Sequence, residues 1–92
     1  MKNHYIRLDI GQSIKIQPIN LEIVLSNHKD DSALLNIIEK NKGTMTELSR
    51  GRYLDGLGYR LEYMGTVGFG RQGIAGLTFR LNLHQNYTYK VV

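Results

Sequence analysis

Apolar side chains recur at every second residue in several separate segments of this 92-residue chain. In residues 4–10 the alternating apolar side chains are Ile6, Leu8 and Ile10. A period of two is the pattern of a β-strand that buries one face and exposes the other. The same pattern predicts further strands at residues 14–17, 20–26, 59–64, 77–83 and 87–92.

Two segments in the middle of the chain depart from this alternation and predict helices. Residues 32–41 carry a broad apolar stripe, which Asp30 and Asp31 precede at positions that favour a helix N-terminus. Gly43 is the expected stop. Residues 44–54 begin with Thr-Met-Thr-Glu, the pattern of a capping box. A glycine inside this second helix costs about 1 kcal/mol relative to alanine, so whether it is fully helical stays open.

The order of these elements, βββ-αα-βββ, predicts an α+β fold. One or two helices would pack on one face of a mainly antiparallel sheet. The turn-forming sequence Gly11-Gln12-Ser13 predicts that residues 4–10 and 14–17 pair as a hairpin. The length of the chain predicts a single small domain over residues 1–92.

The absence of cysteine removes several kinds of chemistry. Without Cys the chain forms no disulfide, no Cys-ligated zinc site and no thiol nucleophile. The usual setting of such a chain is a reducing one, so we expect a cytoplasmic location. The first ten residues alternate polar and apolar, and we therefore expect neither a signal peptide nor a membrane span there.

One glycine-rich motif suggests nucleotide binding, but its surroundings contradict that interpretation. Residues 68–73 spell G-x-G-x-x-G, which cradles a pyrophosphate when a helix follows it. Here a strand pattern follows, and no acidic residue lies beyond Glu62 to hold a ribose. We therefore expect a flexible or bulged hairpin at this place, because glycine permits positive φ and tight turning. The three histidines are scattered and lack metal-ligand spacing. The prediction is a protein that is not an enzyme and has no cofactor.

The distribution of charge points to a contact surface in the second half of the chain. The net charge of the chain is +4. Residues 47–92 carry six basic and three acidic side chains, so this half of the chain holds +3 of the net charge. Arginine and tyrosine are enriched in protein interfaces and also bind phosphates and bases. Residues 48–60 are the densest cluster of these types, although an ordinary wet surface would explain them equally well. The candidate partner-binding residues are Arg50, Arg52, Tyr53, Arg60 and Arg71.

Two stretches resemble a family of uncharacterised small proteins of temperate tailed phages and prophages of enteric bacteria. They are residues 4–12 (HYIRLDIGQ) and residues 43–52 (GTMTELSRGR). The resemblance implies a small accessory protein made inside a bacterial host cell. Proteins of that kind often act by binding a component of the host or of a competing phage.

Three functions follow as hypotheses. The first is a non-enzymatic accessory protein that binds a host or competing-phage protein through residues 48–60 and the 68–73 loop. The second is a small basic nucleic-acid-binding module, whose phosphate contacts would be Arg50, Arg52, Arg60, Arg71, Arg80 and Lys90. The third is a structural homo-oligomer that pairs through residues 87–92, where Val91 and Val92 would be uncovered.

Overall fold

A computed structural model describes residues 2–70 and 73–92 of the chain, with side chains at residues 2–66 and 76–92. The described residues form nine β-strands and no helix. The strands are β1 (Lys2–Leu8), β2 (Ser13–Gln17), β3 (Leu21–Lys29), β4 (Ser32–Glu39), β5 (Lys42–Ser49), β6 (Tyr53–Gly56), β7 (Tyr59–Gly70), β8 (Gly73–Leu83) and β9 (Thr88–Val91).

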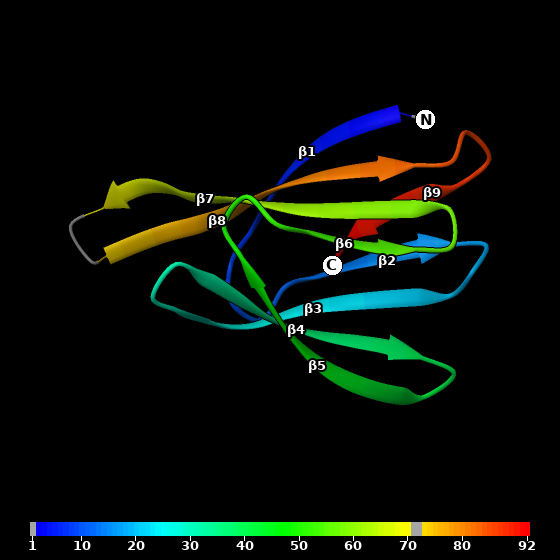
Figure 1. The fold of residues 1–92 in the computed structure, drawn as a ribbon, viewed down its shortest axis with the longest axis horizontal. Helices are drawn as coiled ribbons and strands as arrows, with labels where there is room; N and C mark the ends of the chain where they lie inside the picture. Colours follow the sequence, from blue (N-terminus) through cyan, green and yellow to red (C-terminus); the bar gives the residue numbers. More distant parts are fainter. Residues whose placement is uncertain (1, 71–72) are drawn as a thin grey trace.

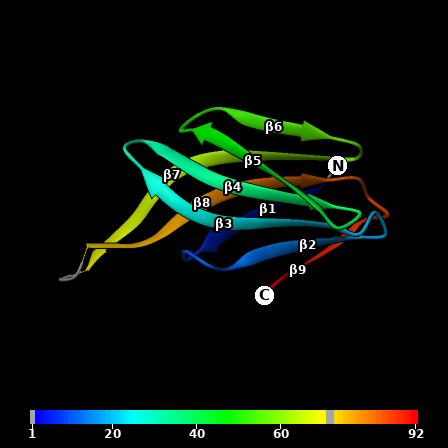
Figure 2. The ribbon, with the colours of Figure 1, turned by 90° about the horizontal axis from the view of Figure 1, so that it is seen from below.

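The strands form two antiparallel sheets that lie one over the other (Figures 1 and 2). The four-stranded sheet has the order β1-β8-β7-β6, and the five-stranded sheet has the order β5-β4-β3-β2-β9. Each sheet is therefore a run of consecutive hairpins joined by one strand from the opposite end of the chain. Through β1 and β9, both ends of the chain pair within the sheets.

Three short links carry the chain from one sheet to the other, between β1 and β2, between β5 and β6, and between β8 and β9. In the first, between β1 and β2, Gly11 donates its backbone N–H to Leu25 and Gln12 accepts one from Leu25. In the second, between β5 and β6, Gly51 donates its N–H to the carbonyl of Tyr63 at 2.8 Å. These bonds satisfy the backbone of the first two links and fix where the next strand begins.

One core fills the space between the two sheets. Inward side chains of both sheets belong to a single cluster, in which Tyr63 and Phe79 are the largest fully buried side chains. Their ring centroids are 5.4 Å apart. Strand alternation explains this core directly, because every second residue of the buried strands faces inward. The fully buried aliphatic members are Leu8, Ile14, Ile16, Leu21, Ile23, Leu25, Leu35, Leu61, Leu77 and Leu81.

The predicted α+β fold is wrong, because the described residues contain no helix. The first predicted helix, residues 32–41, is β4 with the turn that follows it, and the second, residues 44–54, is divided between β5 and β6. In β4 the residues Ala33, Leu35 and Ile37 face the core, while the apolar residues between them lie half-buried on the outer face. A strand covered on both faces has a continuous apolar run, which periodicity cannot distinguish from a helix.

The expected capping signals proved to be turn residues. Asp30 has a φ of 54°, and Lys40 and Asn41 have φ values of 49° and 65°. Two successive residues with positive φ form the tight type of two-residue hairpin turn, and Lys40 and Asn41 connect β4 to β5 in this way. The capping-box sequence at residues 44–47 alternates instead between the two faces of β5.

Two hairpin predictions had opposite outcomes. Residues 4–10 and 14–17 do form strands, but β1 pairs with β8 and β2 pairs with β3 and β9, so the predicted hairpin between them is wrong. The hairpin predicted at the glycine-rich stretch is confirmed, because β7 pairs with β8 up to Gly70 and Gly73. The register shift of this pair lies earlier, between Tyr63 and Gly65, and residues 71–72 lie outside the described residues.

The described part of the chain contains no helix that is long and apolar enough to cross a membrane.

Candidate protein-interaction site

Residues 48–60 run from the end of β5, across the link at residues 50–52, along β6 and into β7. The link is held at several points. Arg50 donates its backbone N–H to Asp31 at 2.9 Å, and Arg52 donates its own to Ser49 at 3.0 Å. The carbonyl of Arg52 in turn accepts the N–H of Tyr63 at 3.2 Å. The backbone under the candidate residues is thus ordered by hydrogen bonds on both sides.

Tyr53 and Arg60 come together on the outer face of the four-stranded sheet. The guanidinium carbon of Arg60 lies 4.1 Å from the centre of the Tyr53 ring. Arg60 also donates two hydrogen bonds to Asp55, at 2.7 and 3.2 Å. Asp55 and Arg60 face each other in the β6–β7 ladder, and Tyr53 is two residues from Asp55 on the same side. The hydrogen bonds to Asp55 raise the pKa of the Arg60 guanidinium.

Further polar side chains extend this cluster across the sheet. Tyr53, Glu62, Arg80 and Tyr5 follow one another across β6, β7, β8 and β1. Arg80 forms an ion pair with Glu62. We name the outer face of the four-stranded sheet the arginine face, and define it by Tyr5, Arg7, Tyr53, Asp55, Arg60, Glu62 and Arg80.

At the β1 margin of the arginine face, an arginine again lies near a carboxylate. Arg7 lies 3.8 Å from Asp9 and passes over Gly76, where an added Cβ would come within 2.5 Å of the Arg7 Nε. A glycine at this position therefore allows the arginine to lie flat on the sheet. The aromatic rings remain exposed, with Tyr5 at 71% and Tyr53 at 55%.

Arg50 and Arg52 lie beside the arginine face and are not among the residues that define it. The Arg50 guanidinium is 3.9 Å from the carboxylate of Asp31, and both side chains are exposed. Its aliphatic part lies 3.3 Å from where a Cβ of Gly65 would be, so Arg50 covers the bulge of β7. Arg52 is exposed and has no ion pair among the described residues. The candidate residue Arg71 lies outside the described residues.

The residues of the nucleic-acid hypothesis are divided between the two sheets. Arg60 and Arg80 lie on the arginine face, whereas Lys90 lies on β9 of the five-stranded sheet. Arg50, Arg60 and Arg80 each have a carboxylate partner. A phosphate group would have to replace these carboxylates, so little unpaired positive charge is available on this face to bind it.

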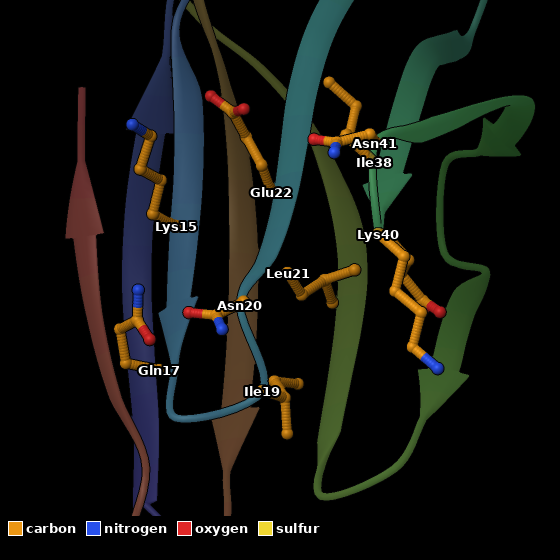
Figure 3. Close-up of a pocket in the computed structure, with 10 residues that line it drawn as sticks. Lys15, Gln17, Ile19, Asn20, Leu21, Glu22, Ile38, Lys40 and Asn41 are labelled. Atoms are coloured by element: carbon orange, nitrogen blue, oxygen red, sulfur yellow. The ribbon is translucent and has the colours of Figure 1, made fainter.

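Sequence reasoning missed a groove on the outer face of the five-stranded sheet (Figure 3). Its volume is about 500 Å³. β2 and β3 supply Lys15 and Glu22, and the β4–β5 turn supplies Lys40. Two lysines and two glutamates line it, so its charge selects neither an anion nor a cation. Neighbouring strands build the groove, and it could have been predicted only from the strand order.

No group of three or more His, Cys, Asp or Glu side chains that could hold a metal ion occurs among the described residues. Burial, followed by the carboxylates of Glu39 and Asp55, raises the pKa of Tyr59. Burial also raises the pKa of Tyr63, whose hydroxyl has no hydrogen-bond partner among the described residues. Both shifts keep the phenol neutral, which is typical of tyrosines that belong to a core.

Comparison of the chain with protein-family models, with curated proteins and with solved structures finds no match.

Proposed function

We propose that this is a non-enzymatic binding protein that contacts a partner protein through the arginine face and the adjoining link at residues 50–52. The phage resemblance implies that the partner belongs to a bacterial host or to a competing phage. The observation that carries the proposal is the stack of Arg60 on Tyr53 with its two hydrogen bonds to Asp55.

This arrangement suits a protein interface for two reasons. Tyrosine and arginine are the residue types that dominate binding energy at interfaces, and the stack holds both of them on a strand pair before any partner arrives. A side chain that is already ordered loses less conformational entropy on binding. The paired carboxylates balance the arginines of this face, which favours a surface of mixed charge over the phosphate backbone of a nucleic acid.

The proposal can be tested by capture followed by a measurement of affinity. Tagged protein would be incubated with bacterial lysate with and without nuclease, and a retained protein would be purified and titrated by calorimetry. We expect Tyr53→Ala with Arg60→Ala to weaken its binding at least about tenfold, as for an interface hot spot. Arg50→Ala with Arg52→Ala would report separately on the link.

A matched control lies on the other sheet. Thr88→Ala with Lys90→Ala changes two exposed side chains of β9 and should leave the affinity unchanged. An equal loss of affinity in the Tyr53/Arg60 variant and in the Thr88/Lys90 control, with each still folded, would overturn the proposed face. Retention that disappears with nuclease, with an affinity that falls steeply with salt, would support the nucleic-acid hypothesis instead.

A further inference from the structure

The free edge of β5 is a second interaction surface, separate from the arginine face. β5 pairs with β4 along all eight of its residues without a register shift, and its other side has no strand partner in the described sheet. Figure 1 shows the first half of β5 along the lower margin of the molecule, from which the strand rises towards β6. Six of its eight residues are exposed, including Met45 at 59%.

The hydrogen-bonding groups on this edge can be assigned from the ladder. A two-residue turn joins Glu39 to Lys42, and the residues that flank such a turn bond to each other. The N–H of Arg50 bonds to the carbonyl of Asp31 in the same ladder. This bond confirms that the even-numbered residues of β5 direct their backbone N–H and C=O groups towards β4. Gly43, Met45, Glu47 and Ser49 therefore direct their backbone N–H and C=O groups away from the sheet, and the carbonyl of Ser49 already accepts the N–H of Arg52.

The usual protections of an edge strand are weak here. Natural edges are shielded by proline, bulges, charged side chains or short length. β5 has no proline and no bulge, and its central residues 43–46 are uncharged. The edge strands β6 and β9 have only four residues each. β9 also lies beside β1, where the rings of His4 and Tyr89 are 4.7 Å apart.

We infer that β5 pairs with β5 of a second copy of this chain, antiparallel about a two-fold axis, and joins the five-stranded sheets of the two copies. Residues that face each other across such an axis lie on the same side of the sheet. A register centred on Met45 places Met45 opposite itself and Gly43 opposite Glu47 of the second copy. In this register Gly43, Met45 and Glu47 all find partners on the second copy.

The side chains of β5 complement themselves in this register. Gly43, Met45 and Glu47 lie on one face of β5, and Lys42 lies on the other, so these three residues of one copy meet those of the second on the same side of the sheet. Glu47 of the second copy would face Gly43, where the Asn36 amide nitrogen of the first copy lies 3.2 Å from the position of a Cβ and the amide oxygen 2.7 Å from it. That nitrogen can donate a hydrogen bond to the incoming carboxylate. The two exposed Met45 side chains would cover each other.

The test is the mass of the protein in solution as a function of concentration, from light scattering after size exclusion. The monomer is 10.5 kDa, and we expect a mass near twice that value, falling towards the monomer on dilution. Met45→Pro removes an outward N–H without removing a bond to β4, and it should raise the dimer dissociation constant at least about tenfold.

The matched control is Val91→Pro on β9. Val92 exchanges backbone hydrogen bonds with Ser13, so the N–H of Val91 points away from β2 in the same manner. This variant should remain dimeric. Met45→Lys keeps every backbone bond and places two lysines opposite each other, so it gives the same test if the proline variant does not fold. A monomer at all concentrations, or a dimer lost in Val91→Pro but kept in both Met45 variants, would overturn the inference.

Discussion

The outer faces of the two sheets carry different kinds of side chain. On the arginine face, arginines form ion pairs with carboxylates on the same or a neighbouring strand, as in Arg60 with Asp55 and Arg80 with Glu62. The outer face of the five-stranded sheet carries half-buried aliphatic side chains, such as Val24 and Ile38, next to exposed lysines. One sheet therefore presents ordered polar groups, and the other presents partly covered apolar surface.

This difference underlies the two proposed interfaces. Ordered, charge-balanced side chains with exposed aromatic rings suit a specific protein contact. Aliphatic surface beside an unpaired strand edge suits extension of the sheet by another strand. The two proposed interfaces rest on different observations, and a variant of one should leave the other intact.

The largest loss of stability is expected from a change in the core that both sheets share. Phe79→Ala deletes a fully buried ring that contacts Tyr63, and such changes cost about 3–5 kcal/mol. Because one core joins the sheets, hydrogen exchange should accelerate in both sheets together, and chemical denaturation should show the lower stability. Met45→Ala, at an exposed position, should change the stability very little. Loss of protection in only the four-stranded sheet would contradict a shared core.

A smaller effect should distinguish two glycines that both have positive φ. Gly58, at the β6–β7 turn, has a φ of 82°, and an added Cβ would come within 2.4 Å of the Tyr87 ring. Gly11 has a φ of 97° with open space around it. Alanine at either position costs about 1–2 kcal/mol for its backbone conformation, and Gly58→Ala adds the overlap. Thermal denaturation should therefore rank Gly58→Ala below Gly11→Ala, and the reverse order would contradict the described packing of Tyr87.

The pH dependence of stability should reveal the burial of Tyr59 in the core. Burial and then the carboxylates of Glu39 and Asp55 raise its pKa in the folded protein, so the folded state holds the phenol proton more tightly than the unfolded chain. The stability from this group is complete below about pH 10, the pKa of the unfolded phenol, and declines as the pH rises from there through the folded pKa.

Denaturation between neutral and strongly alkaline pH tests this expectation. Tyr59→Phe should weaken the alkaline decline, and Tyr5→Phe, at an exposed position, is the control and should not alter it. A decline of the same slope in the Tyr59 variant and the native protein would show that other groups are responsible.

The smallest change in stability is expected at the arginine face. Asp55→Asn removes the charge that holds Arg60, and because solvent screens an exposed ion pair, the free energy of unfolding should change little. Asp30→Asn, in the β3–β4 turn, is a matched control with no ion pair among the described residues. Asp55→Asn should nevertheless weaken the partner affinity, measured by calorimetry, more than the control does. Equal affinities would show that the ordered arginine does not contribute to binding.

The candidate site was predicted only in part from the sequence. Composition selected Tyr53 and Arg60, and the structure brings them into contact because β6 and β7 form a hairpin. Nothing in the local sequence showed that Arg80 and Tyr5 would join the same face. Their strands meet through the pairing of β1 with β8, which connects the two ends of the chain.

The amino-acid sequence by itself determined where most strands lie, because alternation of apolar and polar residues needs no information from distant parts of the chain. It did not determine that residues 32–39 and 42–49 are strands. Their apolar runs and capping-like residues are locally compatible with helices, and the neighbouring strands on both sides decided between the two. The tertiary structure alone decided the strand order, the shared core and the free edge of β5, since pairing depends on residues far apart in the chain.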